Sequence, residues 1–266
     1  MIAAMRTLQF FFLRQAALAC AATTVFVPSS FAASVVLDPS KDNTLYENAS
    51  GLLSNGQGDF LFAGQTGPSD GMNFRRALIA FDLATAIPAN ALITSVTLAL
   101  FANKTAGAAF NTTITLSRLT GDWGEGSSRA PSPEGAGGTA LPGDATWLHQ
   151  FFSNDLWTTP GGDFVTPASA STVISSSQVT YSWSSAGLVN DVQFWINNPA
   201  ANFGWIVRGN ETNSQTAVQF DSRSNLDVSR RPRLTVEYQV IPEPSSALST
   251  LMSVAASAAF LRRRKL

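Results

Sequence analysis

Apolar and polar residues alternate in short runs along most of the chain. The run 75–83 places Ile79 and Phe81 at alternate positions, and the runs 92–101 and 112–119 repeat this alternation. A period of two is typical of β-strands in an antiparallel sheet that has one face in solvent. Further short runs, separated by Gly, Asn, Ser and Pro, predict strands at 34–37, 44–46, 60–63, 177–183, 204–208, 217–222 and 233–240.

One segment has helical spacing instead. Within residues 188–197, Leu188, Val192 and Trp195 recur at intervals of three and four, and Ser185 is placed to cap the helix start. Many short strands with one short helix, and no clear internal repeat, predict a single domain over residues 33–240. We expect an all-β fold, an antiparallel jelly-roll β-sandwich.

The strand rhythm stops between residues 121 and 172. This segment is rich in Gly and Pro and contains Trp123, Trp147 and Trp157. A loop of this length inside a compact domain is usually functional or disordered, and aromatic residues argue against disorder.

A sugar ligand needs a flat apolar face for its C–H surface and polar groups for its hydroxyls. The loop offers both, so it provides the candidate ligand-binding set. Alternatively, the tryptophans pin the loop onto the sandwich and the acids face solvent. The set is Asp122, Trp123, Glu125, Asp144, Trp147 and His149.

The N-terminus has the features of a secretory signal peptide over residues 1–32. Arg6 and Arg14 are followed by an apolar run, 16–27, that is too short to span a bilayer, and small residues precede a cut by signal peptidase after Ala32. Removal of this segment also removes Cys20, the only cysteine of the chain, so disulfides take no part in the stability of the exported domain.

The C-terminus, residues 241–266, has a fixed order of features. Pro242, Glu243 and Pro244 precede an apolar run, 245–261, which we expect to form a transmembrane helix. That run is shorter than the roughly 20 residues that a permanent anchor needs. Arg262, Arg263 and Arg264 follow and, by the positive-inside rule, stay in the cytoplasm. An amphipathic or disordered tail is the alternative.

This order resembles the PEP-CTERM sorting signal of Gram-negative bacteria. The resemblance implies that an exosortase in the inner membrane recognises the motif and cleaves near Glu243. It further implies that the chain is held transiently in the inner membrane and then passes to the cell envelope or extracellular matrix.

The exported part is acidic. The signal peptide and the terminal basic cluster contain six of the 17 Lys and Arg residues, which leaves eleven against 18 Asp and Glu residues. A charge near minus seven disfavours nucleic acid as a partner.

Several motifs together resemble the DNRLRE domain family, surface β-sandwiches related to carbohydrate-binding modules. The resemblance covers roughly residues 35–238, departs from the family name at Thr44 and Tyr46, and implies an extracellular polysaccharide as the ligand. The motifs are Asp42-Asn43-Thr44-Leu45-Tyr46-Glu47, Trp123-Gly124-Glu125-Gly126, Ala145-Thr146-Trp147, Asn202-Phe203-Gly204-Trp205, Phe220-Asp221-Ser222-Arg223 and Arg231-Pro232-Arg233-Leu234, together with the run 75–82.

We expect no enzyme activity. His149 is the only histidine, and no serine lies in a nucleophile-elbow context. A purely structural envelope or biofilm component and a polysaccharide-active enzyme with two loop carboxylates are the alternatives. Arg76 with Asp82, and the Asp221–Arg223 segment, indicate structural ion pairs, with ligand contact as the alternative.

No cofactor is expected, with one alternative. Four oxygen-bearing residues near the start of the domain have the ligand chemistry that calcium prefers, although their spacing is not that of an EF-hand. They are Asp38, Asp42, Asn43 and Glu47.

Overall fold

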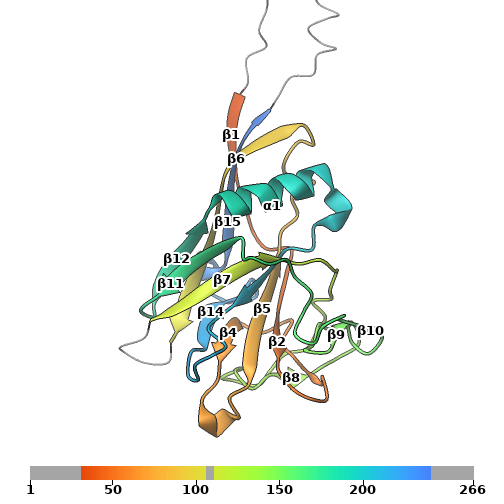
Figure 1. The fold of residues 1–266 in the computed structure, drawn as a ribbon, viewed down its shortest axis with the longest axis vertical. Coiled ribbons are helices and arrows are strands. Elements are labelled where there is room, and N and C mark those ends of the chain that lie inside the picture. Colours follow the sequence, from red (N-terminus) through yellow and green to blue (C-terminus); the bar gives the residue numbers. More distant parts are fainter. Residues whose placement is uncertain (1–30, 106–110, 241–266) are drawn as a thin grey trace, which may run out of the picture. The chain divides into compact units, whose positions relative to one another are not determined.

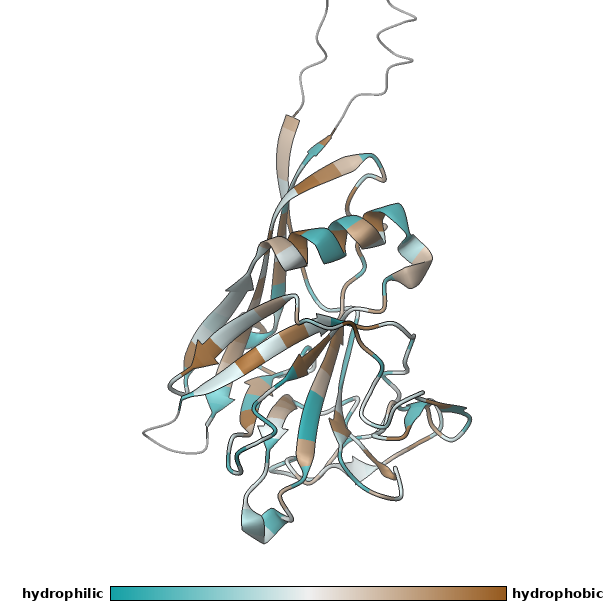
Figure 2. Cartoon of the chain, viewed as in Figure 1, coloured by the Kyte–Doolittle hydropathy of each residue, from teal (hydrophilic) through white to brown (hydrophobic). Residues whose placement is uncertain are grey.

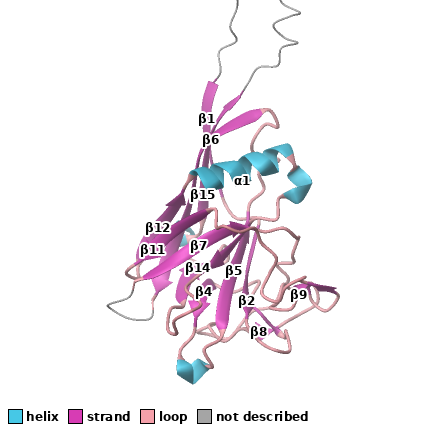
Figure 3. Cartoon of the chain, viewed as in Figure 1, coloured by secondary structure: helices cyan, strands magenta, loops and turns pink. Residues whose placement is uncertain are grey.

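The computed structural model describes residues 31–105 and 111–240, which belong to one compact unit (Figure 1). Strands dominate this unit, and loops make up much of the remainder (Figure 3). Every strand pairing in the described part of the chain is antiparallel. The prediction of an all-β antiparallel fold is therefore confirmed.

The large sheet contains β1 (Phe31–Leu37), β2 (Lys41–Tyr46), β4 (Phe60–Gln65), β5 (Phe74–Ala80), β6 (Ala91–Lys104), β7 (Thr112–Arg118), β11 (Ala170–Ile174), β12 (Val179–Ser184), β13 (Trp205–Arg208), β14 (Val218–Asp221) and β15 (Arg233–Val240). Two small sheets pair β3 (Leu53–Ser54) with β8 (Gly138–Thr139), and β9 (His149–Phe151) with β10 (Asp155–Leu156). The helices are α1 (Ala186–Asn197) and the 3₁₀ turns η1 (Pro68–Asp70), η2 (Pro199–Ala201) and η3 (Val228–Arg230).

The large sheet curls because one strand belongs to both of its halves. Its order is β1-β15-β6-β14-β4-β5-β13-β7-β11, with β12 beside β6 and β2 beside β5. Strand β4 pairs with β14 through residues 60–63 and with β5 through Gly64 and Gln65. Gly64 has a φ of 121°, a conformation that L side chains rarely adopt, and it allows the strand to turn from one half to the other.

The two halves of the curled sheet share one apolar core. From Val96 to Ala102 every second residue of β6 is buried, and Val96, Leu98 and Leu100 pack in one cluster with Ile79 of β5 and Leu116 of β7. The same alternation of apolar and polar positions along the strands is visible in Figure 2. The period of two that predicted these strands is thus the consequence of burying one face of each.

The predicted helix is confirmed and begins slightly earlier than expected. Its first residue is Ala186, and the Ser185 hydroxyl accepts a hydrogen bond from the Leu188 backbone N–H, as the sequence indicated. One face of α1 is buried against the sheet. Gln193 fixes the helix to the start of β6, because its Oε1 accepts a hydrogen bond of 2.9 Å from Ile93 N.

Some predicted strand ends differ from the structure. Strand β5 ends at Ala80 rather than at residue 83, because Asp82 accepts hydrogen bonds from the backbone N–H and hydroxyl of Thr85 and closes a turn. The long loop was predicted to end at Thr172, but β11 already begins at Ala170. The small strands β3, β8, β9 and β10 carried no sequence signal of their own.

The two ends of the unit lie beside each other, because β1 pairs with β15 along their whole length. Phe31 and Ala32, the last two residues of the predicted signal peptide, are the first two of β1; the rest of that peptide lies outside the described residues. The predicted transmembrane helix and sorting motif also lie outside them. In the described ranges, no helix is both long and apolar enough to cross a membrane.

Candidate ligand-binding site

The loop tryptophans are part of the protein interior. Trp123 is 1% exposed and Trp147 is 8% exposed, and both belong to a second apolar cluster under the long loop. The indole N–H of Trp123 donates to Phe203 O at 2.8 Å, and the Lys41 ammonium lies 4.4 Å from its ring centre. These contacts support the alternative that the tryptophans pin the loop, since neither offers a flat face to a sugar.

The loop carboxylates already have protein partners. Asp122 forms an ion pair with Lys41 at 2.6 Å, and Glu125 accepts two hydrogen bonds of 2.9 Å from the Arg223 guanidinium. Asp144 is fully buried and accepts hydrogen bonds from three backbone N–H groups of the loop. The acids of the predicted set therefore hold the loop in shape.

His149 completes the predicted set. Its Nδ1 lies 3.0 Å from the Thr146 hydroxyl, and its ring meets Phe152 edge-on at 5.2 Å. Both neighbours belong to the same loop. The structure thus brings the six residues into one region of the fold and uses each of them for local packing or hydrogen bonding.

Each of the four candidate calcium ligands near the domain start binds a different protein partner. Asp38 forms an ion pair with Arg233, and Asp42 accepts a hydrogen bond of 2.7 Å from Arg223 N. Glu47 accepts one of 2.7 Å from the Phe74 backbone. The Asn43 side chain joins several buried loop groups: it donates to the Ser54 hydroxyl and Glu125 O, and accepts from the backbone N–H of Thr44 and Asn55.

The predicted ion pairs form with different partners. Arg76 binds Glu211 through two hydrogen bonds of 2.7 and 2.8 Å, whereas Asp82 closes the turn after β5. Strand β14 ends at Asp221, so Arg223 lies beyond the strand and forms an ion pair with Glu125. Both arginines therefore form ion pairs, but not with the predicted partners, and Asp221 pairs with neither of them.

Asp221 belongs to a pocket that the sequence did not single out. The pocket has a volume of about 270 Å³ and lies where the end of β14, the start of β4 and the end of β6 meet the loop before β15. Its lining residues are Asp59, Phe60, Asn103, Asp221, Asn225, Leu226 and Arg230. We call this the terminal pocket, because it lies where strands β14 and β6 end.

Three carboxylate oxygens in the terminal pocket lack a partner. Asp221 is 0% exposed, and neither of its side-chain oxygens accepts a hydrogen bond; the same holds for Oδ1 of Asp59. Burial raises the pKa of Asp221 to about 6. The Asn103 amide partly offsets this rise, although no hydrogen bond of normal geometry joins it to the carboxylate. A buried acceptor without a donor is costly, so this arrangement calls for an explanation.

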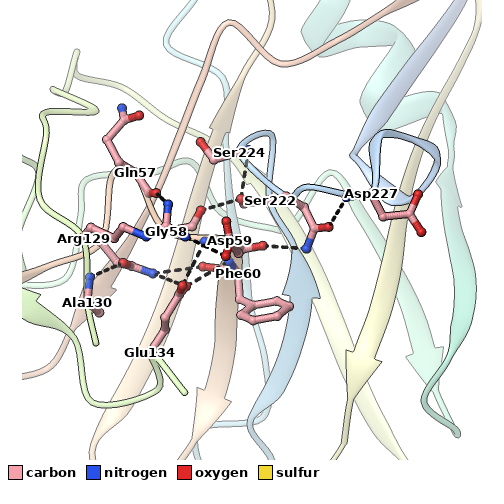
Figure 4. Close-up of polar contacts among 12 residues, drawn as sticks. Gln57, Gly58, Asp59, Phe60, Arg129, Ala130, Glu134, Ser222, Ser224 and Asp227 are labelled. Atoms are coloured by element: carbon pink, nitrogen blue, oxygen red, sulfur yellow. Dashed lines mark hydrogen bonds and ion pairs between the residues drawn. The ribbon is translucent and has the colours of Figure 1, made fainter. Parts of the chain in front are cut away.

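Asp59 is held rigidly at the edge of this pocket (Figure 4). Its Oδ2 accepts a hydrogen bond of 2.6 Å from Arg129, and its backbone N–H donates to Glu134 Oε1 at 3.1 Å. Its carbonyl accepts from the Asn225 amide at 3.1 Å. Glu134, which is nearly buried, also accepts hydrogen bonds from the Asn55 amide and the Phe60 backbone. This network fixes the start of β4, and with it Oδ1 of Asp59.

The terminal pocket lies far from Phe31 and Val240, the two ends of the described unit. Ala91, the first residue of β6, pairs with Val240 at the end where β1 and β15 terminate. Asn103 lies twelve positions later on the same strand and lines the pocket. At about 3.3 Å per residue, roughly 40 Å of strand separates the two places. A ligand in this pocket would be remote from both Phe31 and Val240.

Two comparisons with known proteins gave no match. No family model matches the chain, and no curated protein gives a significant match. The resemblances to the PEP-CTERM signal and to the DNRLRE domain therefore stay hypotheses from the sequence.

Proposed function

We propose that this chain is an exported surface or matrix protein whose jelly-roll β-sandwich binds extracellular polysaccharide through the terminal pocket without catalysis. The observation that carries the proposal is the pocket itself, with three carboxylate oxygens that have no donor among residues 31–105 and 111–240. Sugar hydroxyls are donors of the kind that such acceptors lack.

The rest of the pocket lining fits the same ligand class. Asn103 and Asn225 contribute amides and Arg230 a guanidinium, while the Leu226 side chain is 87% exposed beside them and offers apolar surface to the C–H face of a sugar ring. A volume of about 270 Å³ lies at the lower end of ligand pockets. We therefore expect the pocket to hold a single sugar unit of a longer polymer.

In this proposal, the two terminal segments direct delivery to the outside. A signal peptide over residues 1–32 would start export, and a PEP-CTERM signal over residues 241–266 would be cleaved by an exosortase in the inner membrane of a Gram-negative bacterium. Phe31 and Val240 pair with each other far along the sheet from the terminal pocket, so a domain attached beside either residue would present the pocket away from the attachment point.

The hydrogen bonds and ion pairs of the loop acids support a non-catalytic role. An enzyme that cleaves polysaccharide uses two carboxylates at the reacting bond. Asp122, Glu125 and Asp144, the loop acids of the candidate ligand-binding set, are each bound to cationic or backbone donors of the protein. They are consequently poorly placed to exchange protons with a substrate.

Affinity electrophoresis tests the proposal. The full chain is run through gels that contain polysaccharide purified from the extracellular matrix of the producing cells. We expect retardation of the wild type, and a loss of at least tenfold in affinity for Arg230→Ala and Leu226→Ser. Leu156→Ser is the matched control, because Leu156 is 64% exposed in a hairpin that does not line the pocket.

Three results would contradict this function. Equal retardation of all variants would place binding elsewhere on the chain. Absence of retardation in every matrix polysaccharide would favour a structural component of the envelope. Release of new reducing ends from the polysaccharide would favour the enzyme.

A further inference from the structure

We propose that Asp59 and Asp221 hold a divalent cation of the calcium class in the wall of the terminal pocket. Both residues line the pocket, and three of their four carboxylate oxygens have no hydrogen-bond partner. Asp221 in particular is 0% exposed with both oxygens unpartnered. The site differs from the sequence-derived calcium candidates, whose carboxylates are all engaged by protein donors.

A bound cation would account for the carboxylate oxygens that have no hydrogen-bond donor. Two carboxylates that line one pocket, Asp59 just before β4 and Asp221 at the end of β14, repel each other, and the burial of Asp221 removes water that would screen the repulsion. One divalent ion between them would neutralise both and supply a partner to the three oxygens in the chain without polysaccharide. At these atoms the ion is an alternative to direct contact with the sugar hydroxyls of the proposed function.

The nearby arginine side chains do not neutralise the unpartnered carboxylate oxygens. Arg129 binds Oδ2 of Asp59 and leaves Oδ1 without a donor. Arg230 lines the pocket, but its Nε pairs with Asp227 at 3.1 Å and its guanidinium lies 4.6 Å from the Phe101 ring centre. Neither arginine donates to Asp221.

The chemistry of the lining selects the class of ion. Carboxylates and the Asn103 amide supply oxygen ligands, and no histidine or cysteine lines the pocket, which favours calcium or magnesium over zinc or copper. Calcium tolerates irregular ligand sets completed by water, whereas magnesium demands nearly octahedral geometry. The open side of the pocket gives room for such waters, so calcium is the better match.

The expected affinity is modest. Only two carboxylates line the pocket, and within residues 31–105 and 111–240 no group of three or more Asp, Glu, His or Cys side chains is placed to hold a metal. Sites of extracellular modules bind calcium with dissociation constants of about 10⁻⁴ to 10⁻³ M. The cation site would operate at that level, and it does not depend on a polysaccharide being bound.

Thermal unfolding of the purified full chain provides the test. After treatment with a chelator, the protein is titrated with calcium chloride, and with magnesium or sodium chloride at equal ionic strength. We expect about 10 mM calcium to raise the Tm by about 3–6 °C, with a smaller effect of magnesium. Equilibrium dialysis with radioactive calcium should find one ion per chain.

Two variants separate the site from a general salt effect. Asp221→Asn should abolish the calcium-dependent rise and bound calcium, while its calcium-free Tm stays at or above that of the wild type because a buried charge is removed. Asp155→Asn makes the same change at an exposed position outside the pocket and should keep the full response.

The proposal is overturned if calcium leaves the wild-type Tm unchanged, or if Asp221→Asn responds as the wild type does. Because no polysaccharide is present, this result is separate from that of the affinity gels.

Discussion

Phe31 lies directly opposite Val240 where strands β1 and β15 end. The two predicted processing sites, after Ala32 and near Glu243, therefore flank the same end of one antiparallel strand pair. Removal of either terminal segment takes nothing from the central strands of the sheet, since β1 forms its edge. The domain can thus complete its fold independently of both signals.

Cleavage after Ala32 should leave the domain stable. It removes Phe31, which is 73% exposed, and Ala32, which is also exposed, from the outer end of an edge strand. We expect a chain that begins at Ala33 to lose no more than about 1 kcal/mol in free energy of unfolding relative to one that begins at Phe31. N-terminal sequencing of the exported protein locates the cut, and urea unfolding compares the two chains. A loss above about 2 kcal/mol would mean that β1 needs these residues.

Replacement of Glu243 should block removal of the C-terminal segment. If the exosortase recognises Pro242-Glu243-Pro244, Glu243→Ala removes the only charge of that motif, and the exported chain should keep its basic tail. Intact-mass spectrometry of the envelope fraction detects the difference. Glu237→Ala is the matched control, because Glu237 is an exposed acid six positions earlier on β15. Normal cleavage of the Glu243 variant would refute recognition through this residue.

The fold was predictable where the burial of one face of a strand or helix determines the sequence pattern. The alternation in β6 and the helical spacing from Leu188 to Ile196 both record burial of one face, so the sequence located these elements within a few residues. Strand β4 was also predicted, but its sharing between the two halves of the sheet was not. That arrangement depends on pairings between residues far apart in the chain, which no local pattern encodes.

The site was less predictable, because its residues have no common motif. Asp221 precedes Arg223 by two positions, which suggested a local ion pair, but β14 ends between them and Arg223 turns to Glu125. Asp59 lies in a turn more than 160 positions earlier. The aromatic loop drew attention instead, since a tryptophan suited to stacking on a sugar and one suited to a core look alike in sequence.

Truncation of Trp123 should affect stability and leave the terminal pocket intact. Its side chain is 1% exposed and donates to Phe203 O, so Trp123→Ala should lower the free energy of unfolding by about 3–5 kcal/mol. The folded fraction should bind polysaccharide with unchanged affinity. Leu156→Ala, an exposed position of the same loop, should change stability by less than about 1 kcal/mol. A selective loss of binding in the tryptophan variant would return the ligand site to the loop.

Stability should fall as pH rises from about 4 to 7, in part because of Asp42. Burial is the main cause that raises the pKa of Asp42 to about 7, from 3.8 in the unfolded chain, so over this interval the folded state binds a proton that the unfolded state has released. A shift of about three units corresponds to a loss on the order of 3 kcal/mol. Asp42→Asn keeps an oxygen that accepts from Arg223 N and should flatten this slope, whereas Asp155→Asn should not. Urea unfolding at pH 4.5, 6 and 8 measures the slope, and equal slopes for the wild type and Asp42→Asn would show that Asp42 is ionised throughout.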